Sequence, residues 1–201
     1  MTFSSLLIAI SLSHANSPDL GHFLPPGSPL AGVDGASSHW TNPANLGFDP
    51  DESFSTMLQG PQNLSDWTFA SAYGSGNSSM GLIHRRYDNG DRWWSAGFSQ
   101  GIRLSDSLRL GAQSQWNWGG ERDVFYGMDF GLSYRPTSWF GLGAVTRNAI
   151  GNSSETPKSF NAGLVLRPLG DHLYFGADYQ VFASSDSMWT GTTTASMVAQ
   201  P

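Results

Sequence analysis

The feature that most constrains the fold of this chain is an alternation of apolar residues with small or polar ones. It recurs in segments of about ten residues from residue 67 onward. Successive side chains of a β-strand point to opposite faces, so a period of two predicts strands with one apolar face. Turn-forming residues close each segment, which predicts antiparallel hairpins. The segments with the clearest alternation are residues 93–103, 108–118, 124–134, 140–147, 160–167 and 173–181. Those that fit less closely are residues 53–59, 67–73, 79–87 and 188–198.

The placement of charged side chains distinguishes two folds that share this alternation. A β-sandwich also puts apolar residues on one face of each strand. Here, however, the mid-strand charges Asp129, Arg147 and Asp178 all fall on the face that carries glycine, serine and glutamine. An arginine facing lipid near the bilayer midplane costs about 2 to 4 kcal/mol, so a membrane would enforce this sorting. We therefore predict an all-β fold, an antiparallel transmembrane β-barrel of about 8–10 strands with a polar lumen.

Strand length and aromatic placement favour the same fold. A tilted strand of about 9 to 11 residues spans a bilayer, whereas sandwich strands are typically about 5 to 6 residues long. Aromatic side chains gather towards the ends of the segments, where an interfacial girdle would need them. These rings belong to Trp93, Trp94, Trp116, Trp118, Tyr134 and Trp139.

Composition excludes several other classes of protein. The chain has no cysteine, so disulfide frameworks, thiolate zinc sites, cysteine nucleophiles and a lipoprotein anchor are all excluded. The formal net charge is -6 and Lys158 is the only lysine, so we expect no nucleic-acid partner. No run of residues approaches the roughly 20 apolar residues of a membrane helix, so a membrane could be crossed only by strands.

The N-terminal quarter divides into two predicted regions. Residues 1–15 are interpreted as a signal peptide, because an apolar stretch precedes the small-x-small sequence Ser13-His14-Ala15. A positively charged start is missing, and an ordinary strand is the alternative. Residues 16–52 are rich in proline and glycine, which predicts an irregular periplasmic arm or plug. Residues 53–201 form the predicted β-barrel domain.

The connections predict which end of the barrel faces the periplasm. Every second connection is tight, and the intervening set includes the one long connection, at residues 148–158. Bacterial barrels carry short turns on the periplasmic side and longer loops outside. We therefore expect an outer-membrane protein of a Gram-negative cell, with its N-terminus in the periplasm. The tight connections are residues 74–78, 105–107, 136–138 and 168–171.

Two sequence elements resemble a known family. The first is Asn42-Pro43-Ala44-Asn45-Leu46, which is similar to an element near the N-terminus of the FadL-type transporters and PorV-type barrels. The hairpin of residues 131–144, with a second copy at 163–177, resembles their periplasmic hairpins. The resemblance implies that the first element, Asn42 to Leu46, forms an N-terminal hatch inside the barrel. Asn45 stands where that family usually has glycine.

The resemblance leaves the extent of the barrel open. FadL has more strands than this length holds, and the last ten residues are small and polar, so a longer barrel cut short fits as well as a ten-stranded one. Similar hairpins also resemble the N-terminal region of SppA-like signal-peptide peptidases, which would place a protease beyond residue 201.

Candidate functional residues lie in the predicted lumen. Their charges would tune selectivity or form salt bridges that seal a narrow pore. Inward glycine and serine would give either room for a plug or close side-chain packing. The lumen candidates are Asp129, Asp178, Arg147, Arg103 and Arg109.

Catalytic chemistry finds little support in the sequence. The five histidines show no metal-ligand spacing, and Lys158 lies in a polar loop of asparagine, serine and threonine, a poor setting for a catalytic lysine. We therefore expect no enzyme activity, metal or cofactor within this chain.

Three functions fit these expectations. The first is passive transport of a small hydrophobic molecule through an outer-membrane barrel. The second is a non-catalytic scaffold or anchor for a secretion partner or a fused peptidase. The third is a secreted β-sandwich that binds carbohydrate through tryptophan rings.

Overall fold

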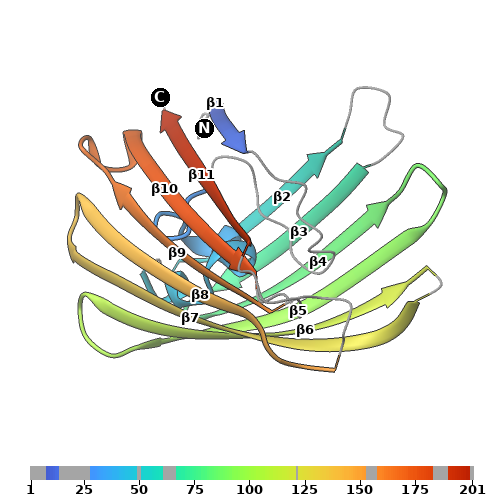
Figure 1. Ribbon diagram of the computed structural model, residues 1–201. Coiled ribbons are helices and arrows are strands. Elements are labelled where there is room, and N and C mark those ends of the chain that lie inside the picture. Colours follow the sequence, from blue (N-terminus) through green and yellow to red (C-terminus); the bar gives the residue numbers. More distant parts are fainter. Residues whose placement is uncertain are drawn as a thin grey trace.

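The described strands form one antiparallel sheet. The computed structural model describes residues 8–13, 28–48, 51–60, 67–120, 122–152, 158–182 and 190–199. Eleven strands are hydrogen-bonded in the order β1-β11-β10-β9-β8-β7-β6-β5-β4-β3-β2, and the sheet curls into a barrel-like wall (Figure 1). The strands are β1 (Ile8–Ser13), β2 (Ser53–Gln59), β3 (Trp67–Ser75), β4 (Ser78–Arg86), β5 (Arg92–Arg103), β6 (Leu108–Gly119), β7 (Arg122–Thr137), β8 (Phe140–Gly151), β9 (Ser159–Leu166), β10 (Leu173–Phe182) and β11 (Thr190–Ala199).

An irregular arm lies inside this wall. The short coils that follow β1 along the chain are enclosed by the curve of the sheet (Figure 1). They are the 3-10 helix η1 (Gly35–Ser37), the single helical turn α1 (Ser38–Thr41) and the 3-10 helix η2 (Pro43–Phe48). A fourth short helix, η3 (Gly170–His172), sits in the connection between β9 and β10. Within the described residues no helix has the length and apolar character needed to cross a membrane.

The predicted all-β fold with an N-terminal irregular arm is confirmed. β2 to β11 supply ten strands from the region assigned to the barrel, and each pairs with its sequence neighbour. The alternative of a β-sandwich is wrong, because all eleven strands belong to one sheet. In addition, Ile8–Ser13 pairs with β11, as the alternative of a strand in this segment required. Removal of residues 1–15 stays a prediction, and residues 1–7 and 14–27 lie outside the described part of the chain.

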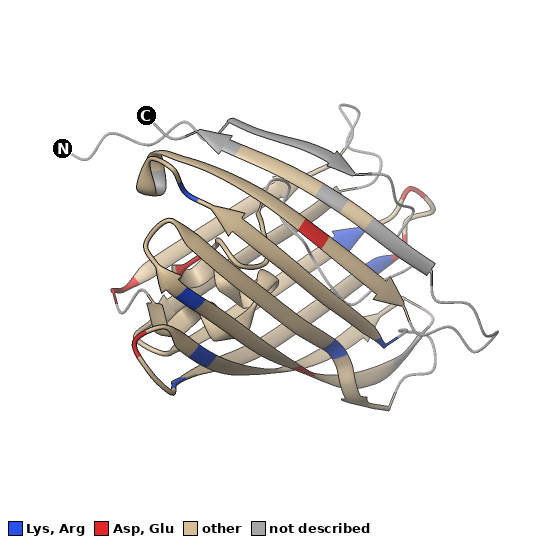
Figure 2. Cartoon of the chain, turned by 60° about the vertical axis from the view of Figure 1, so that its left-hand side comes forward, with Lys and Arg blue, Asp and Glu red and all other residues tan. Residues whose placement is uncertain are grey.

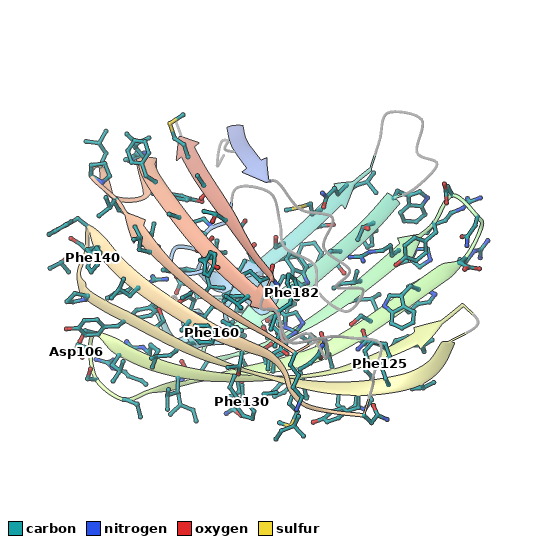
Figure 3. All side chains as sticks on the ribbon, in the orientation of Figure 1. Asp106, Phe125, Phe130, Phe140, Phe160 and Phe182 are labelled. Atoms are coloured by element: carbon teal, nitrogen blue, oxygen red, sulfur yellow. The ribbon has the colours of Figure 1, made fainter. Side chains whose placement is uncertain are left out.

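The two faces of the sheet have inverted polarity. On β6 the side chains of Gln113, Gln115 and Asn117 are buried. The alternate residues Trp116 and Trp118 are exposed. The same holds on β7, where Asp129 is buried and Phe130 points away from the enclosed arm (Figure 3). Few charges interrupt the strands between their ends (Figure 2). An apolar outer face with a polar inner face is the arrangement that lipid on the outside requires.

One departure from regular pairing lies next to the arm. Between the pairs Phe130↔Thr146 and Met128↔Ile150 the register shifts, so that Asp129 alone faces three residues of β8. Such a bulge adds residues to one strand and redirects their side chains. As a result the side chains of Arg147 and Asn148 are both buried, although neighbours in a regular strand would point to opposite faces. The backbone of Asn148 takes a φ of 51°, in the left-handed region.

Candidate functional site: the arm and its socket

The arm is buried along most of its described length. Leu30, Trp40 and Leu46 are each no more than 3% exposed, and Asn42 and Asn45 are fully buried. Because the arm is irregular, much of its backbone has no partner of its own, and buried backbone groups need partners. The inner face of the sheet supplies them. The arm and the residues that bind it therefore form the candidate functional site.

Glycines on the inner face give the arm its space. A β-carbon built on Gly111 would overlap the backbone of Pro43 and Ala44, and one on Gly131 would overlap the Asn42 amide. The inward glycines therefore serve close approach of a second piece of backbone, one of the known uses of glycine in strands. Of the two expectations for the glycine face, room for a plug is what the structure shows.

The Asn-Pro-Ala-Asn-Leu element folds at the centre of this socket. Asn42 donates from Nδ2 to the carbonyl oxygen of Leu132 on β7 at 3.0 Å, and its Oδ1 accepts from the Ala44 amide. Asn45 donates from Nδ2 to the carbonyl oxygen of Leu30, so it ties two parts of the arm together. The five predicted hatch residues thus lie inside the barrel. Their action as a hatch stays a prediction.

A buried ion pair holds the middle of the arm. Arg147 and Asp129 approach to 3.3 Å, and both side chains are almost fully buried. The second guanidinium nitrogen of Arg147 donates to the carbonyl oxygens of Trp40 and Thr41, at 3.0 and 2.8 Å. Asp129 also accepts from the backbone N–H of Asn148, which fixes the bulge. The pair thus joins β7, β8 and the end of α1.

Two arginines that sequence reasoning missed hold the start of the arm. Arg135 binds both carboxylate oxygens of Asp34, at 2.5 and 2.8 Å. Arg167 lies 3.5 Å from the same carboxylate and donates to the carbonyl oxygen of Gly32. Both arginines directly precede a proline at the start of a tight connection, and nothing in that local sequence points to a partner. Asp34 is the only acidic residue between positions 28 and 48, so it is the one residue of the arm that could form an ion pair with an arginine of the barrel wall.

The remaining lumen candidates divide between the arm and the surface. Arg109 donates from Nε to the carbonyl oxygen of Gly47, and its guanidinium lies 4.5 Å from the centre of the Phe48 ring. Both carboxylate oxygens of Asp178 accept from the Leu30 amide at 3.2 Å. Arg103, in contrast, is exposed at the end of β5 and pairs with Asp106 in the turn that follows.

One predicted girdle residue also lies elsewhere. Trp93 is 3% exposed and stacks inside the barrel against Phe125, with ring centres 5.2 Å apart. Trp94, the next residue, takes the opposite face and lies 4.0 Å from the His84 ring. The sequence pair Trp93-Trp94 was interpreted as two interfacial rings, but consecutive strand residues must point to opposite faces. The expectation for Trp93 is therefore wrong.

His39 is the buried titratable group of the arm. Its Nδ1 lies 2.8 Å from the Ser99 hydroxyl and 3.1 Å from the Ser79 hydroxyl, and Nε2 lies 3.3 Å from the Gln113 amide nitrogen. Gly97 leaves space for the ring. Burial lowers the pKa of His39 to about 4, and the positive charge of Arg147 acts in the same direction against the opposing effect of Asp129. His39 is therefore neutral when the arm is docked at neutral pH.

Acidification is expected to weaken docking of the arm through His39. The docked pKa is below that of a free histidine, so docking is strongest above pH 6.5 and weakens as pH falls towards 4. The full loss is on the order of 3 kcal/mol. Hydrogen exchange of arm amides, measured from pH 7 to 4 in wild type and in His39→Gln, checks this. The difference between the two curves should grow on acidification, and parallel curves would contradict the assignment.

The fold and the site define a class of architecture: a membrane-type antiparallel β-barrel with an N-terminal arm docked on its inner face. In the described part of the chain no group of three acidic, histidine or cysteine side chains could hold a metal ion. No family model matches the sequence, and no curated protein matches it.

Comparison with solved structures finds a similar fold in a channel protein. It is the CymD monoaromatic hydrocarbon channel, which superposes with a TM-score of 0.48 over 80% of this chain and 70% of that chain. The two sequences are 14% identical.

Proposed function

We propose that this protein is an outer-membrane β-barrel that lets a small hydrophobic molecule cross passively, with the arm as a displaceable hatch. The observation that carries the proposal is the arm itself, buried within a sheet whose outer face is apolar. A chain built only to anchor something in a membrane has no evident need for a glycine socket complementary to a second segment.

Polar contacts of the arm explain how such a hatch could both hold and release. The charged side chains that bind the arm do so through a few hydrogen bonds at separate places along it. These places are Leu30, Gly32, Asp34, Trp40 with Thr41, and Gly47. One hydrogen bond contributes a net stabilisation of about 0.5 to 1.5 kcal/mol. The arm can therefore detach from the wall at one place while its other contacts stay formed. Transport of this kind uses no cofactor and no bond-breaking step.

Replacement of the arm is the direct test of the proposal. Residues 31–48 are exchanged for a glycine-serine segment of equal length, which removes the hatch but keeps the connection to β2. Uptake of a hydrophobic solute into proteoliposomes is expected to rise, because the lumen is no longer filled. Heat-modifiable gel mobility and outer-membrane fractionation verify that the barrel still folds and inserts in the membrane.

The scaffold function predicts a different result in the same experiment. If uptake stays at the level of empty liposomes both with and without the arm, the barrel does not conduct. An anchor for a secretion partner or a peptidase would then be favoured. A protein that stays soluble without detergent would contradict the membrane assignment itself.

A further inference from the structure

We propose that Asn117 and Asn148 form the recognition site for the polar head of the transported molecule. With Trp93 and Phe125 they make up what we call the amide patch. Its ligand is a small neutral molecule with an apolar body and a head that both donates and accepts hydrogen bonds. This inference rests on the proposed function and deepens it, because it separates amphipathic solutes from plain hydrocarbons.

The first observation is that both amides lack hydrogen-bond partners. Asn117 is 0% exposed and Asn148 is 4% exposed, and neither the nitrogen nor the oxygen of either side chain has a partner. Buried polar groups are nearly always paired, so each exception needs an explanation. A ligand head that binds these atoms supplies what the barrel wall does not.

The second observation is that the amides lie beside aromatic rings on the same inner surface. Asn117 stands directly opposite Phe125 in the pairing of β6 with β7. Phe125 in turn stacks against Trp93 of β5. A ligand whose head reaches Asn117 therefore places its body against these rings, which favours an aromatic or compact aliphatic body.

The third observation concerns Asn148 and the bulge. Its Oδ1 occupies the space that a β-carbon on Gly127 would need, and Gly127 is the next inward residue of β7 after Phe125. The backbone of Asn148 is left-handed, a conformation that asparagine adopts more readily than most other residues with a side chain, so the bulge can place an amide here. Asp129 holds this backbone in place. The bulge thus turns a second amide towards the patch.

The electrostatics of the patch favour a neutral head. Among the described side chains of β7 and β8, the buried charges are Asp129 and Arg147, and they are paired with each other. A side-chain amide presents a carbonyl acceptor and N–H donors, so two of them match a primary amide or a hydroxyl group. Arg147 is the chain neighbour of Asn148 and binds the arm, so ligand binding and arm release are expected to be coupled.

Matched solutes test this inference with the full-length protein in detergent. Benzamide and toluene share one ring and differ in the polar head, and calorimetric titration measures the affinity of each. In Asn117→Leu we expect benzamide to bind roughly tenfold more weakly, because its head loses a buried partner, while toluene binding stays unchanged. Asn148→Gly is expected to show the same selective loss, since glycine adopts the left-handed backbone without strain.

The control variant is Asn161→Leu. Asn161 is also buried with both amide atoms unpartnered, but it lies on β9 opposite Val145. It is expected to keep the wild-type affinities for both solutes. Heat-modifiable mobility establishes that each variant is folded, and Asn148→Gly decides the matter if Asn117→Leu does not fold.

Each remaining outcome overturns a defined part of the inference. Unchanged benzamide affinity in both patch variants, equal weakening of both solutes, or no benzamide binding to wild type would each overturn the amide patch. Selective binding without any flux in proteoliposomes would leave the patch standing and overturn the transport function instead.

Discussion

Replacing Gly111 by leucine is expected to expel the arm from the barrel interior. The new β-carbon would coincide with the backbone of Pro43 and Ala44, and backbone cannot swing aside as a flexible side chain can. Overpacking of this kind costs about 1 to 3 kcal/mol or more, so undocking should become at least roughly tenfold more frequent. Limited proteolysis of the arm in membrane-embedded protein measures this frequency, and solute uptake should rise with it.

Ala112→Leu is the control for this prediction. Ala112 is the next residue of the same strand and takes the opposite, outward face, so the same side chain is added without touching the arm. Its proteolysis rate should match wild type. Gly111→Ala should fall between the two. If Gly111→Leu keeps the wild-type rate while the barrel is folded, the socket is not what holds the arm.

The strands of this protein could be predicted closely from the sequence because lipid and lumen impose opposite demands on alternate residues. Residues 53–59 coincide with β2, and residues 108–118 differ from β6 by a single residue at one end. Mid-strand charges such as Asp129 could be assigned to the lumen, because only one face tolerates them. The bulge in β8, in contrast, could not be predicted, because the alternation of residues around Arg147 and Asn148 does not indicate it.

The contacts of the arm could not be predicted, because they join segments far apart in the chain. Nothing local distinguishes Arg135 or Arg167, which bind Asp34, from Arg103, which pairs with Asp106 in the adjacent turn. All three precede or lie near tight turns at the same end of the barrel. The distinction depends on which of them the arm passes, and that is set by the three-dimensional course of residues 28–48.

Removing the guanidinium of Arg147 is expected to be the most damaging single change within the lumen. Arg147→Leu leaves the Asp129 carboxylate without its ion-pair partner and takes the donor away from the Trp40 and Thr41 carbonyl oxygens. Breaking one side of a buried ion pair typically costs about 3 to 5 kcal/mol. Hydrogen exchange of arm amides should therefore accelerate by two orders of magnitude or more, at roughly 1.4 kcal/mol per tenfold change.

The second half of this test is a double-mutant cycle. Asp129→Asn removes the charge but keeps an oxygen that can accept from the Asn148 amide. If the cost in Arg147→Leu comes mainly from the unpaired carboxylate, the double variant should exchange more slowly than Arg147→Leu alone, because no buried charge remains. If the costs instead add without coupling, the guanidinium acts on the arm carbonyls independently of Asp129. The contribution of Arg147 to arm docking would then come from its own hydrogen bonds to the arm, and the ion pair would stabilise only the barrel wall.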